Sequence, residues 1–224
     1  MNTNLELAGA REIPIKNMDD LQVPDRKFGF SILLCASTRA GKTTMLNFLY
    51  DRHFKNHITT VMSNSLQSDA YDYIKQWCIL TDLYHPEMLK EMYQINHGTD
   101  NNYEFCVVLD DLTNIKNDKE YLKLLTIYRN SRISCIVSAQ GISMFNKTCR
   151  GNINYVLLGR LNSDAEVEKV VKEYLLSYFP RHLNLTEKIT LYRQLTSEHW
   201  FFVIDQVNGE VFRSKLRPEQ CFNE

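Results

Sequence analysis

Short apolar runs recur along this chain, and polar or glycine-containing turns separate them. Runs of this length, rich in Val, Ile and Leu, predict strands that are buried on both faces of a sheet. Between the runs, apolar residues recur at the spacing of amphipathic helices. Expected strands span 32–35, 58–62, 105–111, 133–140 and 154–158, expected helices span 44–50, 68–78, 86–95, 118–129, 165–178 and 186–195, and a β-hairpin turning at Asn208-Gly209 is expected over 200–212. This alternation predicts an α/β fold with a mostly parallel central sheet flanked by helices and a C-terminal β-hairpin.

The N-terminal residues 1–27 depart from this alternation. They are polar and twice interrupted by proline, so we expect an N-terminal arm, with a short edge strand over 12–16 as the alternative. The rest of the chain, 28–224, is long enough for one α/β domain. Two of its helices have recognisable caps, Asp118 and Thr186.

The most specific motif lies between a predicted strand and a predicted helix. Residues 36–43, ASTRAGKT, have the spacing of a P-loop (Walker A), with Ala36 where the pattern has Gly. In such a loop, backbone N–H groups cradle phosphate oxygens at the helix N-terminus. Lys42 is expected to reach the β- and γ-phosphates of ATP, and the Thr43 hydroxyl to bind Mg²⁺. The expected nucleotide-binding residues are Ser37, Thr38, Arg39, Ala40, Gly41, Lys42, Thr43 and Thr44.

Two further strands end in polar side chains that suit the same site. The run 105–111, FCVVLDD, has the form of a Walker B strand, in which Asp110 would hold the Mg²⁺ shell and Asp111 would act as general base. The run 133–140 ends in Gln140, whose amide can bind the γ-phosphate or the attacking water. Taken singly, each strand end could be a solvated polar turn. Together with a P-loop they predict one shared site, because ligands bind at the C-terminal ends of parallel strands.

Arginines near the Gln140 strand are candidates for a second role. Arg129 and Arg132 precede the strand, and Arg150 follows it. P-loop motors often insert an Arg into a neighbouring subunit's site, where it stabilises charge on the transferred phosphoryl group. A solvated surface position is the simpler interpretation of any one of them.

Composition limits the other functions. The 224 residues carry a net charge of −1, so any contact with DNA must be local. No apolar run approaches the roughly 20 residues of a membrane span, and the polar N-terminus is not a secretory signal. The six cysteines show no CxxC pairing, which argues against disulfides and against a zinc site. This usage fits a reducing compartment.

The ordered motifs resemble a known family. FSILLCASTRAGKTT, FCVVLDD, YRNSRISCIVSAQ and CRGNINYVLLGR are similar to segments of the poxvirus-type genome-packaging ATPases of large double-stranded DNA viruses and virophages, within the FtsK/HerA superfamily of P-loop NTPases. The resemblance covers roughly 28–160, and the C-terminal hairpin is similar to the family's ending. It implies a RecA-like ATPase domain that forms a ring and pushes double-stranded DNA, without reading its sequence, into a preformed capsid. It also implies contact with capsid or portal-vertex proteins, and a location in the virion or at the viral assembly site in the host cytoplasm.

The resemblance also assigns roles to single residues. Matching positions are Lys42 and Thr43 for phosphate and Mg²⁺, Asp110 and Asp111 for the acidic pair, and Gln140 for the sensor. The family has an Arg eleven residues before that Gln, which is Arg129 here, and an Arg-x-Asn after the sensor strand, which matches Arg150. These two therefore rank above Arg132 as residues acting in a neighbour's site. Ala36 and Asn130, which stands where the family often has His, depart from the pattern.

Three other functions fit the motifs. A small-molecule P-loop kinase would need an acceptor pocket and an Arg-rich lid, and no such lid is evident in the sequence. A nucleotide switch or assembly protein would bind ATP with little turnover. Within the superfamily, a helicase or a conjugation-type DNA pump uses the same site.

Overall fold

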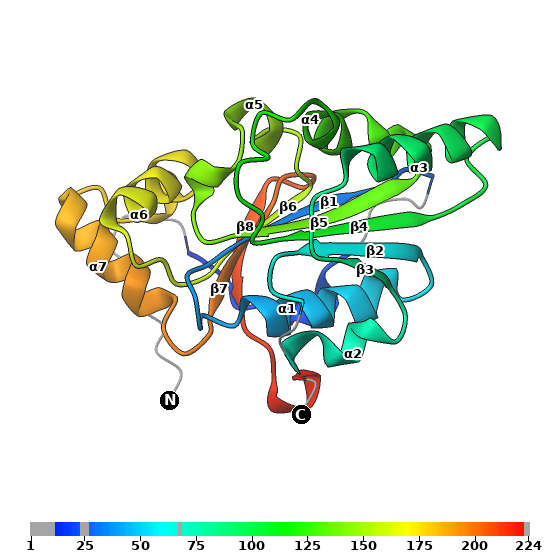
Figure 1. The fold of residues 1–224 in the computed structure, drawn as a ribbon. Coiled ribbons are helices and arrows are strands. Elements are labelled where there is room, and N and C mark those ends of the chain that lie inside the picture. The colour runs from blue at the N-terminus through cyan, green and yellow to red at the C-terminus, as the bar shows by residue number, and fades with distance from the viewer. Residues whose placement is uncertain (1–11, 23–26, 67–68, 222–224) are drawn as a thin grey trace.

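The structure is a computed structural model that describes residues 12–22, 27–66 and 69–221. Across these residues an eight-stranded sheet runs through the centre of the molecule (Figure 1). Its strands are β1 Ser31–Cys35, β2 Ile58–Ser63, β3 Ile79–Thr81, β4 Phe105–Asp110, β5 Ile133–Ala139, β6 Tyr155–Leu158, β7 Phe201–Asp205 and β8 Glu210–Ser214. Their order is β3-β2-β4-β5-β1-β6-β7-β8. All pairs from β3 to β6 are parallel, and the β6–β7 and β7–β8 pairs are antiparallel.

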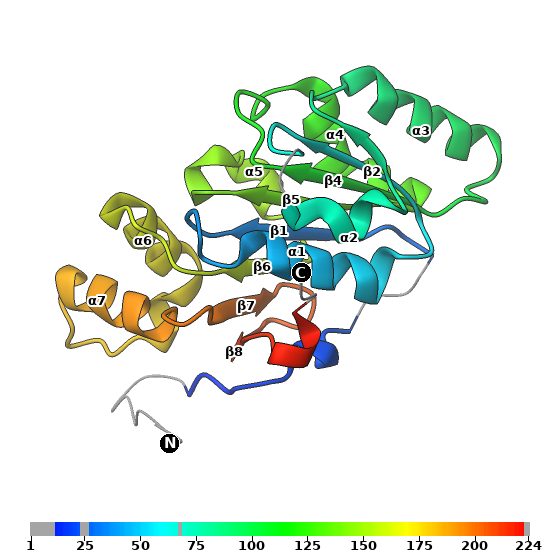
Figure 2. The same ribbon diagram turned by 60° about the horizontal axis from the view of Figure 1, so that its bottom comes forward.

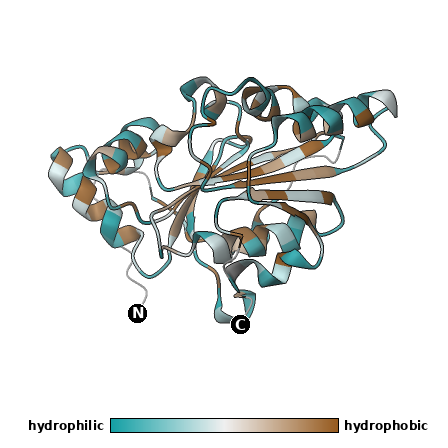
Figure 3. Ribbon diagram, in the orientation of Figure 1, coloured by the Kyte–Doolittle hydropathy of each residue, from teal (hydrophilic) through white to brown (hydrophobic). Residues whose placement is uncertain are grey.

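Helices cover both faces of the sheet (Figures 1 and 2). They are α1 Lys42–Leu49, α2 Asp72–Lys75, α3 Pro86–Gly98, α4 Lys119–Thr126, α5 Lys147–Arg150, α6 Asp164–Val170 and α7 Leu185–Leu195. In β1, Ile32 and Leu34 pack with α1 and α2, whereas Leu33 and Cys35 pack into the cluster under α3 to α7. Hydrophobic residues accordingly gather along the strands (Figure 3). A sheet covered on both faces explains why its parallel strands read as continuous apolar runs.

The predicted α/β fold, the mostly parallel sheet and the hairpin at its edge are confirmed. Two local predictions are wrong. The helix expected over 68–78 ends at Lys75, and the chain continues into the edge strand β3, which is too short to stand out as an apolar run. The cap of α7 is Asn184, not Thr186: the Asn184 side chain accepts a hydrogen bond from the backbone of Glu187, whose carboxylate accepts one in return.

The segment 12–22 lies against the last strand of the sheet. Ile15 pairs with Arg213 in one parallel bridge, and the side chains of Met18 and Leu21 are buried. This part of the predicted arm is therefore attached to the domain. The boundary proposed at residue 27 remains a prediction.

Candidate nucleotide-binding site

The strand order brings the predicted site residues to one edge of the sheet. The P-loop follows β1, Asp110 ends β4 with Asp111 directly after it, and Gln140 follows β5. β5 pairs with β1 on one side and β4 on the other, so its end lies between the P-loop and the acids. Because these strands are parallel, their C-terminal ends form one rim, where α/β sheets bind ligands.

The P-loop leaves backbone donors free at the start of α1. The N-cap is Gly41, with φ 86°, which has no side chain to cap the helix. α4, α5 and α7 are instead capped by the side chains of Asp118, Asn146 and Asn184. The first N–H groups of an α-helix have no partner within it, and they attract anions. The loop therefore offers the donors that a phosphate group needs.

Gly159 explains how the loop accommodates Ala36. Ala36 is fully buried, and its φ is not positive, so this position needs no glycine. Its methyl group occupies space that a side chain on Gly159, at the end of β6, would fill. A Cβ on Gly159 would lie 2.9 Å from the Ala36 Cβ and 2.6 Å from the Phe201 ring. Ala36 can thus replace the glycine that the pattern expects, because Gly159, directly after the neighbouring strand β6, leaves space for its methyl group.

Gly159→Ala is expected to lower the free energy of unfolding by about 1–3 kcal/mol, because the added methyl overpacks the contact with Ala36 and Phe201. Ala36→Gly in the same chain should recover part of the loss. Thermal unfolding of the two single variants and the double variant gives the coupling free energy between positions 36 and 159. Strictly additive effects would contradict the proposed compensation.

Lys42 and Asp111 face each other across this rim. The Lys42 ammonium donates a hydrogen bond to Asp111 Oδ2 at 3.0 Å, and the lysine is buried, with 7% of its surface exposed. Asp111 has a left-handed backbone, with φ 49°, and its N–H bonds to the Ser138 carbonyl. Its Oδ1 is buried and has no hydrogen-bond partner among the described residues. A strained residue with an unpaired acceptor is typical of a functional position.

Asp110 lies behind this pair and is held by two hydroxyl groups. Tyr71, from the segment before α2, donates a hydrogen bond to Oδ2, and Ser138 of β5 donates one to Oδ1. The pKa of Asp110 is raised to about 6: burial is the main cause and the charge of Asp111 adds to it, whereas the bond from Tyr71 and the charge of Lys42 oppose the rise. Since the folded protein favours the protonated form, the contribution of Asp110 to stability falls as pH rises from about 4 to 6.

Tyr71→Phe is expected to raise the Mg²⁺ concentration that half-saturates ADP binding about tenfold, because outer hydrogen bonds orient metal-binding carboxylates. Calorimetric titration of ADP at several Mg²⁺ concentrations measures this shift. Tyr73→Phe removes a hydroxyl two residues away that bonds to Asp51, and it should leave the Mg²⁺ dependence unchanged. Equal behaviour of the two variants would count against the role of Tyr71.

The residues at this rim fit Mg²⁺. They offer the Thr43 hydroxyl, half-buried in the first turn of α1, and the carboxylates of Asp110 and Asp111. These are hard oxygen donors of the kind that Mg²⁺ prefers, and the unpaired Asp111 Oδ1 is available to a water in a metal shell.

The remaining predicted residues lie at two opposite rims of the sheet. The Gln140 side chain is exposed at the P-loop rim. The chain around Arg129 lies at the opposite rim, where its carbonyl accepts a hydrogen bond from Gly29, ahead of β1. Arg150 precedes β6 on that side, is 8% exposed and pairs with Glu173 at 2.7 Å. Neither arginine belongs to its own chain's P-loop site, so their action in a neighbour's site remains a prediction.

Several residues around the P-loop were missed from the sequence. The Ser37 N–H bonds to the Arg160 carbonyl at 2.8 Å, and the Asn162 N–H bonds to Ser37 Oγ at 2.9 Å. Both partners follow β6. Because β6 is another parallel strand with polar residues after it, the same reasoning that found Gln140 could have placed them at this rim. Tyr71 and His199, which lies against Gly41, come from segments with no motif.

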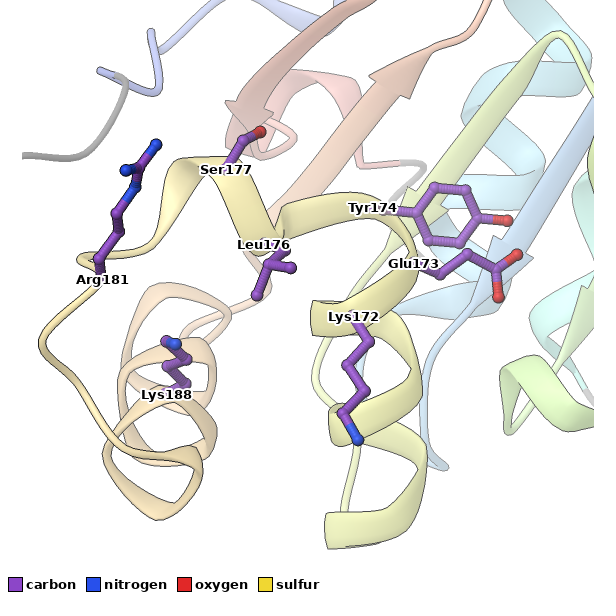
Figure 4. Close-up of a pocket in the computed structure, with 7 residues that line it drawn as sticks. All are labelled: Lys172, Glu173, Tyr174, Leu176, Ser177, Arg181 and Lys188. Atoms are coloured by element: carbon purple, nitrogen blue, oxygen red, sulfur yellow. The ribbon is translucent and has the colours of Figure 1, made fainter.

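A surface hollow of about 510 Å³ lies away from this rim, between the helical segments that follow β6 (Figure 4). Lys172 and Arg181 at its border point away from each other (Figure 4). Lys172 pairs with Glu168, and Glu173 pairs with Arg150. The charged groups around the hollow do not converge on one point, so the P-loop rim is the better candidate site.

The chain matches no protein-family model and no curated protein. Solved structures do match. The genome packaging NTPase B204 from Sulfolobus turreted icosahedral virus 2, in complex with ATP-γ-S, has a TM-score of 0.56 at 9% identity over 84% of this chain and 97% of its own. The pCW3 conjugation coupling protein TcpA has a TM-score of 0.58 at 12% identity over 89% of this chain and 64% of its own. EssC ATPases 2 and 3 from Geobacillus thermodenitrificans have a TM-score of 0.51 at 15% identity over 80% of this chain and 41% of theirs.

These matches agree with the family that the motifs resemble, and at such identities they establish the fold alone. They place the chain in the RecA-like P-loop architecture. Within the described part of the chain, no helix combines the length and apolar character of a membrane span.

Proposed function

We propose that this chain, whose fold is shared with a viral genome-packaging NTPase, hydrolyses ATP to drive double-stranded DNA into a preformed viral capsid. The observation that supports it most directly is the P-loop lysine facing an acid at 3.0 Å, with a second, buried acid behind it. A P-loop followed by paired acids and a Gln on the intervening strand suits attack by water better than transfer to a small acceptor.

Each residue has a separate task in the proposed reaction. The N–H groups of Gly41 and Lys42 hold the phosphates, which replace Asp111 as the partner of the Lys42 ammonium. Asp111, released from that pair, accepts a proton as the water oxygen bonds to the γ-phosphorus and the bond to the ADP oxygen breaks. Gln140 orients the water. Mg²⁺ held by Thr43 and Asp110 would neutralise charge on the β- and γ-phosphate oxygens.

The proposed motor is a ring in which Arg129 or Arg150 completes the site of the next subunit. Arg129 is the stronger candidate, because it is only partly buried, whereas Arg150 is held by Glu173. Mixing two inactive variants tests this. Lys42→Ala retains Arg129, and Arg129→Ala retains the P-loop, so mixed rings should regain activity that neither variant has alone. Mixtures as inactive as their components would argue against action in a neighbour's site.

ATP turnover with and without double-stranded DNA, across protein concentration, tests the motor itself. We expect DNA to stimulate turnover and the rate per chain to rise cooperatively with concentration, because the site is shared. Turnover that responds to neither would contradict a ring motor on DNA. A shift of the stimulation to lower DNA concentration at low salt would follow from phosphate contacts.

A conjugation-type DNA pump is the second candidate, since TcpA matches 89% of this chain. Both functions move DNA, and they differ in partner. Capsid or portal-vertex proteins and a location in the virion or at the assembly site belong to the packaging proposal. Nuclease protection of DNA that depends on added capsids would favour packaging, and translocation that is indifferent to capsids would favour the other pump.

A further inference from the structure

The turn between α7 and β7 places a histidine on the P-loop. β7 is antiparallel to β6, so its first residue lies at the same rim as the nucleotide site. The His199 ring lies in front of Gly41, on the side where a side chain would project: a methyl group on Gly41 would lie 3.2 Å from His199 Nδ1 and 3.7 Å from its Cγ. The imidazole is nevertheless exposed to solvent. It therefore stands beside the N–H groups that would hold phosphate.

The backbone of this turn is held in a defined conformation. Glu198 and His199 both have left-handed backbones, with φ of 52° and 62°. Before them, the buried Thr196 hydroxyl bonds to the Tyr192 carbonyl at 2.9 Å. After them, the Arg213 guanidinium stacks on the Trp200 ring, with its central carbon 4.7 Å from the centroid of that ring. Consecutive residues in a sparsely populated conformation persist where the surrounding structure fixes them, and such positions cluster at ligand sites.

We propose that His199 is a phosphate-contacting residue of the nucleotide site, which it closes on the side opposite Asp111. The inference rests on the proposed function, because it needs a nucleotide on the P-loop. A ring beside Gly41, next to Lys42, is within reach of phosphate oxygens bound at the P-loop, and an imidazole N–H is a hydrogen-bond donor. His199 thus adds a donor from the turn before β7 to those of the P-loop.

Chemical modification of the unaltered protein tests this without a variant. Diethyl pyrocarbonate modifies exposed imidazoles, and mass spectrometry follows each site. Saturating inorganic pyrophosphate should slow modification of His199 at least about fivefold and leave that of His182, exposed between α6 and α7, unchanged. Unchanged modification of His199 would overturn the inference. If calorimetry shows that the unaltered protein binds neither pyrophosphate nor ADP, the nucleotide site itself fails, and the role of His199 fails with it.

A pair of glycine variants separates contact from backbone effects. Glycine adopts a left-handed backbone without strain, so His199→Gly removes the ring alone, and Glu198→Gly makes the same backbone change next to it. His199→Gly should weaken pyrophosphate and ADP binding about tenfold each, as expected for a lost hydrogen bond to a charged group. Glu198→Gly should bind both like the unaltered protein. Weaker ADP binding with unchanged pyrophosphate binding would move the contact to the nucleoside and overturn the phosphate assignment.

Discussion

Lys42→Ala is expected to reduce ATP turnover by about 10²–10³-fold or more, because it removes the ammonium that would stabilise charge on the transferred phosphoryl group. The side chain is buried, and its ammonium bonds to Asp111. The same change should also weaken nucleotide binding, since the phosphates lose a charged donor. Steady-state hydrolysis and calorimetric binding measure the two effects.

Lys172→Ala is the matched control for this variant. It removes the same charge from an exposed helical position, where Lys172 pairs with Glu168 far from the rim. Its turnover should equal that of the unaltered protein. Hydrolysis by Lys42→Ala at the unaltered rate would show that the P-loop is not the catalytic site.

Asp111→Asn is expected to lower turnover by about 10²–10⁴-fold while nucleotide binding persists, because an amide of the same shape cannot accept the proton of the attacking water. Loss of a negative charge next to the phosphates should leave ATP affinity equal or higher. This separation of turnover from binding distinguishes an enzyme from a nucleotide switch, whose function would survive the change. Single-turnover hydrolysis and binding of ATP-γ-S provide the two measurements.

Asp100→Asn serves as the control, because Asp100 is an exposed acid between α3 and β4, at the opposite end of β4 from the acidic pair. It should leave both turnover and binding unchanged. Normal turnover in Asp111→Asn would instead assign the water-activating role to another residue, with Gln140 the first to examine.

The fold and the placement of the candidate site residues at one rim could be predicted because their signals are local in sequence. Each strand carries its own apolar run, and the polar residue that follows it reaches the ligand edge whenever the strands are parallel. Lys42, Asp111 and Gln140 all follow this rule. Even the strand order agrees with the expectation that the three strand ends share one site.

The residues that surround these groups depend on packing between distant segments. Tyr71 reaches Asp110 from 39 positions away, and no motif marks it. Gly159 leaves room for both Ala36 and the Phe201 ring, a relation that exists only once β6 lies between β1 and β7. His199 reaches the P-loop because β7 is antiparallel to β6, so that the turn before β7 lies at the rim where β6 ends. Local patterns carry no information about such contacts, so sequence reasoning missed them for a physical reason.

The separation of Arg129 from the P-loop has a geometric consequence for assembly. The two lie at opposite ends of parallel strands, roughly 20 Å apart for strands of this length. In the proposed ring, each subunit gives Arg129 to the next subunit and receives the arginine of the previous one, so this contact is heterologous. Repetition of a heterologous contact forms a closed ring where the rotation between subunits closes the circle, and otherwise it extends as a helix. Substitutions that tilt the interface of the proposed ring are therefore expected to yield open filaments, visible by electron microscopy.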